Sequence, residues 1–233
     1  MRSTGRLARL FTGLASAALA SATLAVSATG AHAAGEVARL YAPKPPPGSA
    51  FVRVVDLSGT PGSFTFGDGP AAKAADGEVA TLFRIVKGGV PLALARDGSP
   101  VTASLVPAAD GFSTVVIPPG GAPAQIISDS TEGRNDLKAQ LRFYNFVPGC
   151  AGAVVVVDGP TVFEDVATFG TRQRVINPIE ASLSGRCGAA ASPALKLPPL
   201  KAGDNFSLFL VETPAGLALK GQRDETEPYR SAN

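Results

Sequence analysis

The 233-residue chain has one histidine, no tryptophan and only two cysteines. The histidine, His32, lies near the N-terminus, in a segment that we expect to be removed from the mature protein. Acyl-transfer triads need a base beside the nucleophile, usually histidine, and the mature chain has none. Gly-x-Ser-x-Gly elbows, Walker loops, zinc-ligand spacings and Gly-x-Gly-x-x-Gly turns are also absent from the sequence. The sequence therefore predicts no catalytic residues, no cofactor and no metal site.

The N-terminal segment has the pattern of a cleavable secretory signal peptide. Three arginines within the first nine residues precede an Ala/Leu-rich run from Leu10 to Val26. Ala31-His32-Ala33 is a small-x-small cleavage site, which predicts cleavage between Ala33 and Ala34. A membrane anchor, the alternative, needs about 20 strongly apolar residues, and this run is too short and too rich in small side chains. We therefore expect export to the periplasm and no membrane span.

Removing residues 1–33 also changes the charge balance. The segment contains three arginines and no acid, so the mature chain keeps 18 basic against 19 acidic residues, a formal charge of −1. A protein that binds nucleic acid or anionic lipid through phosphates needs a basic stripe, and the sequence shows none. Nucleic acid is therefore not an expected partner.

The two cysteines, Cys150 and Cys187, are expected to form a disulfide, because exported proteins with an even and minimal number of cysteines usually pair them. The bridge would close a loop of 38 residues, counting both ends. Chain-entropy reasoning assigns such a bridge roughly 4 kcal/mol of stabilisation. A metal site or a reactive thiol is the alternative, but no histidine or further cysteine is present to complete a site.

Four sequence blocks occur twice in the same order, which indicates a tandem duplication. The block pairs are "AFVRVVDLSG" (50–59) with "AQLRFYNFVPG" (139–149), 68–70 with 158–160, 84–98 with 174–188, and 109–117 with 203–211. The offsets are 89, 90, 90 and 94 residues. In this alignment Cys150 and Cys187 correspond to Thr60 and Asp97, so we expect those two residues to lie near each other.

Each copy consists of short segments rich in Val, Phe, Thr and Ile, separated by Gly, Pro, Asp or Ser, which is typical of β-strands. Several strands in about 90 residues, without a helical period, indicate an antiparallel sandwich. We predict an all-β protein of two tandem antiparallel β-sandwich domains joined by a short linker; a single barrel through both halves is the competitor that the repeat argues against. The predicted segments are a signal peptide (1–33), domain 1 (34–130), domain 2 (136–222) and a flexible tail (223–233). The linker lies within Ser128–Asp136, whose acids do not have the spacing of a calcium loop.

Two other groups of residues are candidates for a catalytic or glycan-binding site. Glu164-Asp165 and Asp224-Glu225 are adjacent acids that a glycosidase could use, but neighbours on a strand point to opposite faces, and we interpret both pairs as surface acids. Arg53, Arg142 and Arg174 could bind a charged glycan in a polar groove. We interpret these arginines as outward, solvated residues, and the phenylalanines as core residues.

The segment "LYAPKPPPGSAFVRVVDLSG" (40–59) resembles the AlgF family of periplasmic proteins required for alginate O-acetylation. "INPIEASL" (176–183) and the later "FSLFLVE" are similar to two further strands of that family, in the right order, and the resemblance extends from about Leu40 to about Leu219.

The resemblance implies a non-catalytic adaptor of an exopolysaccharide O-acetylation complex. A membrane O-acyltransferase and separate periplasmic esterase-like enzymes handle the acetyl group in such systems. The implied partners are these periplasmic and membrane components, and the polysaccharide itself is a candidate partner. The alternative is a periplasmic polysaccharide-binding protein without an enzyme partner.

Overall fold

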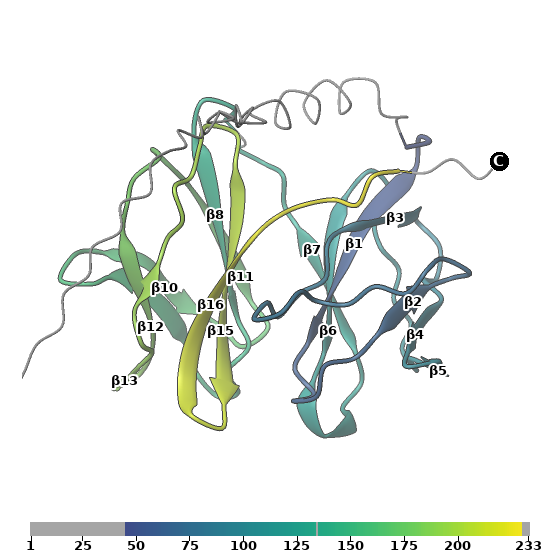
Figure 1. The fold of residues 1–233 in the computed structure, drawn as a ribbon, viewed down its shortest axis with the longest axis horizontal. Coiled ribbons are helices and arrows are strands. Elements are labelled where there is room, and N and C mark those ends of the chain that lie inside the picture. Colours follow the sequence, from purple (N-terminus) through teal and green to yellow (C-terminus); the bar gives the residue numbers. More distant parts are fainter. Residues whose placement is uncertain (1–44, 134, 230–233) are drawn as a thin grey trace, which may run out of the picture. The chain divides into compact units, whose positions relative to one another are not determined.

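The computed structural model describes residues 45–133 and 135–229. The predicted signal peptide, with its cleavage site at Ala33 and Ala34, lies outside the described residues. Within the described ranges, no helix is long and apolar enough to cross a bilayer. Apart from a short 3₁₀ turn at Pro119–Gly121, the regular structure of these residues consists of β-strands (Figure 1).

The first half of the chain forms two sheets that enclose an apolar core. The inner sheet has the order β3 (Arg84–Lys87), β1 (Ser49–Asp56), β6 (Phe112–Ile117), β7 (Gln125–Asp129), and the outer sheet has the order β2 (Phe64–Phe66), β4 (Leu94–Arg96), β5 (Ser99–Pro100). Because side chains alternate along a strand, Ala50, Val52 and Val54 of β1 all point into this core, where they meet Phe64 and Leu94.

The second half repeats this arrangement. Its inner sheet has the order β11 (Thr171–Ile176), β8 (Ala139–Asn145), β15 (Asn205–Thr213), β16 (Gly216–Arg223), and its outer sheet has the order β10 (Thr161–Val166), β9 (Gly152–Val156), β12 (Ser182–Cys187), β13 (Ala190–Ala191), with β14 (Leu195–Lys196) also paired to β12. Leu141, Phe143, Leu208 and Leu210 of the inner sheet fill the core between the two sheets. The prediction of an all-β fold with two sandwich domains is therefore confirmed.

The topology confirms the duplication and corrects one of its offsets. The inner sheets correspond strand by strand, β3-β1-β6-β7 to β11-β8-β15-β16. In the first half Arg53 is paired with Thr114, and in the second Arg142 is paired with Ser207. Thr114 therefore corresponds to Ser207, an offset of 93 rather than 94. The physical reason is the period of two along a strand, since a slip of one residue would turn core side chains toward the other face.

The sheets are antiparallel with one exception in each half. Strand β1 runs parallel to β6, and β8 runs parallel to β15. Parallel neighbours need a long connection. In each half, the chain between the two parallel strands forms the strands of the outer sheet before it enters the second parallel strand. These two central pairs are the exceptions within the antiparallel sandwiches that the sequence predicts.

The inner sheets of the two halves also contact each other, on the face opposite each half's own core. Val55 and Val116 of the first half share an apolar cluster with Tyr144, Phe209 and Val211 of the second. Strands β1 and β8 are consequently covered on both faces, and all seven residues of β8 are buried.

The segment after β16 continues into the first half. Thr226 forms a parallel bridge with Phe83, whose N–H and C=O bond to Glu225 and Glu227. Arg84 forms an ion pair with Glu227 at 2.9 Å. Residues 225–227 lie in the segment that the sequence predicts to be a flexible tail, and in the structure this part of it pairs with Phe83, the residue that precedes β3.

Candidate functional site

A buried arginine lies at the centre of the contact between the two halves. Arg53 of β1 has no exposed surface. Its guanidinium donates hydrogen bonds to Thr114 Oγ1 at 3.0 Å within its own half. The other acceptors come from the second half: Asp224 Oδ1, Tyr144 Oη and Ser207 Oγ, each at 2.8 Å. The guanidinium carbon also lies 4.6 Å from the ring centroid of Phe83, a cation–π distance.

Burial and neighbouring groups shift the pKa values of Arg53 and Tyr144 in this cluster. Burial alone would lower the pKa of Arg53, but the interaction with Tyr144 and the negative charges of Asp224 and Asp129 outweigh it and raise that pKa. Burial raises the pKa of Tyr144 above its ordinary value, against the opposing charge of Arg53. Tyr144 therefore stays protonated, accepts from Arg53 and donates to Asp129 Oδ1 at 2.6 Å.

The cluster has the symmetry of the duplication. Asp129 of β7 pairs with Phe112 of β6, and Asp224, which directly follows β16, bonds through its N–H to Asn205 of β15. Because Asn205 corresponds to Phe112, Asp224 corresponds to Asp129. Asp129 accepts from Thr114 at 2.8 Å, and Asp224 accepts from the corresponding Ser207 at 2.6 Å. Arg53, Thr114 and Asp129 of the first inner sheet therefore correspond to Arg142, Ser207 and Asp224 of the second.

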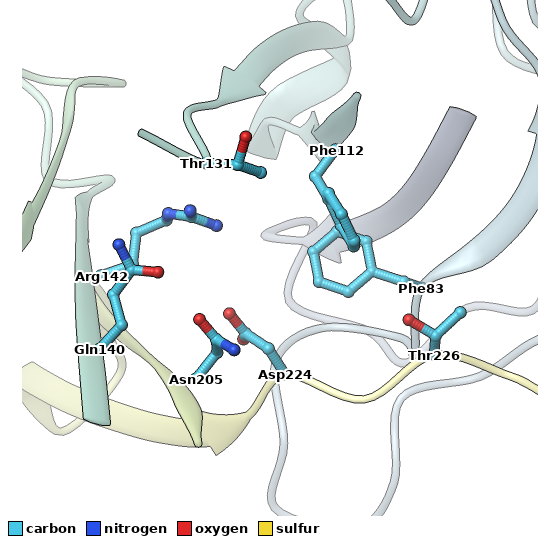
Figure 2. Close-up of a pocket in the computed structure, with 8 residues that line it drawn as sticks. All are labelled: Phe83, Phe112, Thr131, Gln140, Arg142, Asn205, Asp224 and Thr226. Carbon is cyan, nitrogen blue, oxygen red and sulfur yellow. The ribbon is translucent and has the colours of Figure 1, made fainter. Parts of the chain in front are cut away.

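A cavity of about 190 Å³ lies beside this cluster. Its lining residues are Phe83, Phe112, Thr131, Gln140, Arg142, Asn205, Asp224 and Thr226. Figure 2 shows the polar side chains Gln140, Arg142, Asn205 and Asp224 on one side and the two phenylalanine rings on the other. The cavity thus combines a charged and amide-lined wall with an aromatic wall.

Two of the three arginines that the sequence singles out lie at this site. Arg53 and Arg142 are buried, with 0% and 7% of their surface exposed, whereas Arg174 of β11 is exposed. The interpretation of Arg53 and Arg142 as outward, solvated residues is wrong, because the other half covers the face on which they lie. The apolar run around each arginine was the sequence signal of this burial, because strands that are covered on both faces do not alternate between apolar and polar residues.

The two pairs of adjacent acids differ in their environments. Glu164 and Asp165 are exposed, as expected for surface acids. The side chain of Asp224 is 9% exposed and pairs with Arg53, so its interpretation as a surface acid is wrong. Tyr144, Ser207 and Thr114 were not singled out in the sequence, and only the alternation of β8, β15 and β6 could have placed them on this face.

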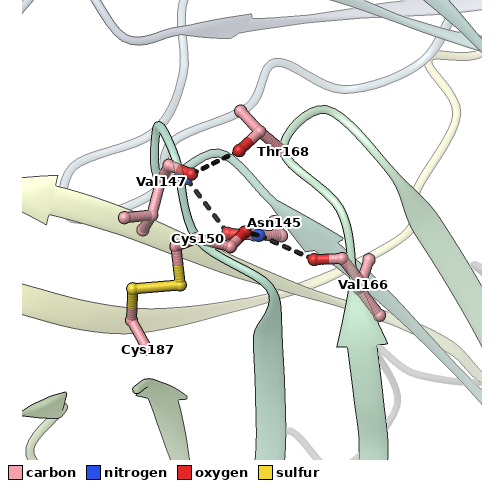
Figure 3. The surroundings of a disulfide bond; sticks show 6 residues. All are labelled: Asn145, Val147, Cys150, Val166, Thr168 and Cys187. Atoms are coloured by element: carbon pink, nitrogen blue, oxygen red, sulfur yellow. Dashed lines mark hydrogen bonds between the residues drawn. A yellow bond between two sulfur atoms is a disulfide. The ribbon is translucent and has the colours of Figure 1, made fainter. Parts of the chain in front are cut away.

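The predicted disulfide is confirmed. Cys150 and Cys187 are bonded, with their Cα atoms 5.7 Å apart. The bridge ties the loop after β8 to the end of β12, and Figure 3 shows Asn145 beside it. The Asn145 side chain donates to the carbonyls of Cys150 and Val166 at 2.7 and 2.8 Å. A Cβ on Gly152 would lie 2.7 Å from Asn145 Cγ, so only glycine leaves room for this amide.

In the first half, hydrogen bonds and an ion pair join the segments that correspond to the two bridged by the disulfide. Arg96 donates to Asp56 Oδ2 at 3.1 Å and to the Thr60 carbonyl at 2.7 Å. Asp97, next to Arg96, exchanges hydrogen bonds with the backbone of Ser63. Thr60 and Asp97 therefore lie on neighbouring segments, as the alignment predicts.

The residues that the structure describes contain no cluster of three or more His, Cys, Asp or Glu side chains that could hold a metal ion. Ser207 and Thr114, the two aliphatic hydroxyl residues that contact Asp224 and Asp129, have no exposed surface. They donate to Asp224 and Asp129 and cannot be reached by a substrate in this conformation.

The chain is similar to proteins that are already known. The family model described as "Alginate O-acetyl transferase AlgF" matches residues 21–204. The chain is 29% identical over 209 residues to the alginate biosynthesis protein AlgF of Pseudomonas putida, an alignment that covers 89% of this chain and 93% of that protein. Among solved structures it is similar to the C-terminal domain of AlgF from P. aeruginosa, with 26% identity, a TM-score of 0.33, and coverage of 37% of this chain and 98% of that structure.

Proposed function

Because the chain belongs to the AlgF family, we propose that it is a non-catalytic periplasmic adaptor of a complex that O-acetylates an alginate-like exopolysaccharide. The family match confirms the resemblance identified at residues 40–59. The relative in P. putida is named an alginate biosynthesis protein and aligns over most of both chains, which supports a role in the same process. Export by the predicted signal peptide, with cleavage after Ala33, is part of this proposal.

The observation that supports the non-catalytic role is that the buried carboxylates and hydroxyls bond to other residues of the protein. Asp224 is paired with Arg53 at 2.8 Å, and Asp129 accepts from both Tyr144 and Thr114. These groups would supply the base and the nucleophile of an acyl transfer, which needs a base beside an accessible nucleophile. Here they hold the two halves together, so they support a structural and docking role.

Acetyl turnover by the purified protein tests the non-catalytic role. The mature protein is incubated with an activated acetyl ester, with and without alginate oligosaccharides, and released or transferred acetyl is measured. We expect a rate equal to that of the protein-free blank. A rate above the blank that persists through repeated purification would contradict the proposal and favour a transferase.

Capture of partners tests the adaptor role against its alternative, a polysaccharide-binding protein without an enzyme partner. The tagged protein is isolated from membranes of the producing bacterium after brief cross-linking. We expect a membrane O-acyltransferase or a periplasmic acetyltransferase among the captured proteins. Capture of polysaccharide with neither enzyme would support the alternative instead.

A further inference from the structure

A second cavity adjoins the one beside the Arg53 cluster, and Arg142 lines both. The second cavity measures about 320 Å³, and its lining residues are Ser128, Ser130, Arg142, Thr171, Arg172 and Gln173. The Arg142 side chain therefore separates two hollows that both halves of the chain contribute to. We call the two cavities together the Arg142 groove.

The groove contains buried polar atoms without a protein partner. The side-chain nitrogen of Gln140 is buried and makes no hydrogen bond within the described residues, and Gln140 is 93% buried. In the second cavity, Thr171 Oγ1 is likewise buried without a hydrogen bond to a described residue. Leaving such a group buried and unpaired destabilises the protein. A polar ligand that bonds to Gln140 would remove this destabilisation.

The duplication supplies an internal comparison for the same positions. In the first half, Phe51 and Phe112 are paired across β1 and β6, and their rings stack with centroids 4.5 Å apart. The corresponding pair in the second half is Gln140 and Asn205, paired across β8 and β15. The stacked apolar pair of one copy is thus replaced by two amides in the other, and both amides line the same cavity as Phe112.

The charge of the groove favours an anion. Arg142 donates to the Ser130 carbonyl and to the Gln173 side-chain oxygen, and both acceptors are neutral. Arg172 adds a second, exposed positive charge. The carboxylate of Asp224 also lines the groove, but Arg53 pairs with it at 2.8 Å.

We propose that the Arg142 groove binds uronate residues of the polysaccharide. The guanidinium of Arg142 suits a carboxylate, since arginine forms strong, charge-assisted bonds with carboxylates. Gln140, Asn205 and the nearby hydroxyls suit sugar hydroxyl groups, and the rings of Phe83 and Phe112 suit the apolar face of a sugar ring. Alginate is a polymer of uronic acids, so this inference rests on the proposed function and names the ligand of the adaptor.

The dimensions limit what each cavity can hold. Pockets for drug-sized ligands measure about 300–1,000 Å³, so the cavity of about 190 Å³ suits one sugar ring at most. The cavity of about 320 Å³ on the other side of Arg142 offers space for a neighbouring ring. A short stretch of polymer would thus place one carboxylate near Arg142 and another near Arg172.

Titration of the wild-type protein tests the proposal without any substitution. Short alginate oligosaccharides are added to the mature protein, and the side-chain amide NMR signals of Gln140 and Asn205 are followed. We expect both signals to shift saturably, and neither to shift with neutral manno-oligosaccharides of the same length. Sodium acetate distinguishes a site for any small carboxylate from a site for the polymer. Absence of a shift with oligouronate, or an equal shift with acetate or the neutral sugar, would overturn the proposal.

Three variants test the site by calorimetry. Gln140→Phe/Asn205→Phe copies the first half into the second and should abolish binding, and Arg142→Gln should raise Kd about tenfold or more. Arg174→Gln removes an exposed charge from the same sheet and should leave Kd unchanged. Thermal unfolding confirms that each variant is folded. Unchanged binding by the folded double variant, or equal losses in Arg142→Gln and Arg174→Gln, would contradict the site.

Failure of this proposal and failure of the proposed function give different results. If deletion of the gene removes acetyl esters from the polymer but oligouronates leave Gln140 and Asn205 unchanged, the adaptor role stands and the groove is not a uronate site. If oligouronates bind but deletion leaves the polymer fully acetylated, the groove assignment stands and the link to acetylation is wrong.

Discussion

Arg53 and Asp224 form an ion pair of 2.8 Å although 171 positions separate them in the sequence. Arg53 lies in the first strand of the first half, and Asp224 directly follows the last strand of the second. Side-chain exposures of 1% and 9% make this a buried pair. The pair joins the two copies of the duplication at the centre of their contact.

Loss of the carboxylate at this pair should destabilise the protein strongly. We expect Asp224→Asn to lower the free energy of unfolding by about 3–5 kcal/mol, because it removes the carboxylate that pairs directly with the buried charge of Arg53. Urea denaturation measures the change. The exposed acid Glu164 provides the control, since Glu164→Gln should alter stability by less than about 0.5 kcal/mol. A loss below 1 kcal/mol for Asp224→Asn would mean that the pair contributes little.

Tyr144 should matter through its hydroxyl group. Tyr144→Phe keeps the ring in the apolar cluster but leaves Asp129 Oδ1 without its 2.6 Å donor. We expect a loss of about 1–3 kcal/mol, the usual cost of an unsatisfied buried group. Tyr229→Phe, outside this cluster, is the matched control. Equal stability of the two variants in urea would show that the hydroxyl is dispensable.

Removal of the segment after β16 should cost more than the single substitution at Asp224. A chain that ends at Arg223 loses the carboxylate partner of Arg53 and also the backbone pairing of residues 225–227 with Phe83. We expect its free energy of unfolding to fall below that of Asp224→Asn. If truncation costs no more than the substitution, the pairing with Phe83 does not stabilise the fold.

The disulfide should be fully formed and should stabilise the protein. Thiol titration of the unreduced, denatured protein should detect no free cysteine, and reduction should lower the free energy of unfolding by about 2–5 kcal/mol. Cys150→Ser/Cys187→Ser should match the reduced wild type, and reduction should not affect it. Two reactive thiols before reduction would contradict the observed bridge.

Acid stability should depend in part on Asp204. Burial alone would raise the pKa of Asp204, but the Lys201 N–H and the Arg223 guanidinium outweigh it and lower that pKa. A carboxyl with a lowered folded-state pKa stabilises the fold above its unfolded pKa of about 3.9. This stabilisation is lost as pH falls through the folded-state pKa. The stability difference between wild type and Asp204→Asn should therefore be largest at neutral pH and shrink in acid, and a constant difference in urea titrations would contradict this.

Much of the fold was predictable because its signals are local or repeated. Strand composition, turn residues and the recurrence of "FVRVVD" as "QLRFYN" indicate two β-sandwiches without any knowledge of distant contacts. The disulfide followed from two cysteines in a chain that the sequence predicts to be exported. The parallel pairing of β1 with β6 was not predictable in the same way, because strand direction depends on the path of the residues between them.

The environment of Arg53 and Asp224 was not predictable from local sequence. An arginine within a strand normally points to solvent, and the face of β1 that contains Arg53 is buried only because the other half covers it. The partners of Arg53 in that half are 91 to 171 positions away. The buried environments of Arg142 and Gln140 were not predictable for the same reason, because residues of both halves line the groove.

The most direct test of the proposed role is the acetyl content of the exported polymer. The gene is deleted in a producing bacterium, and O-acetyl esters per uronate residue are measured by NMR in the secreted polysaccharide, with a complemented strain as the control. We expect export to continue, acetyl esters to be lost in the deletion strain, and the wild-type gene to restore them. Fully acetylated polymer from the deletion strain would contradict a role in O-acetylation.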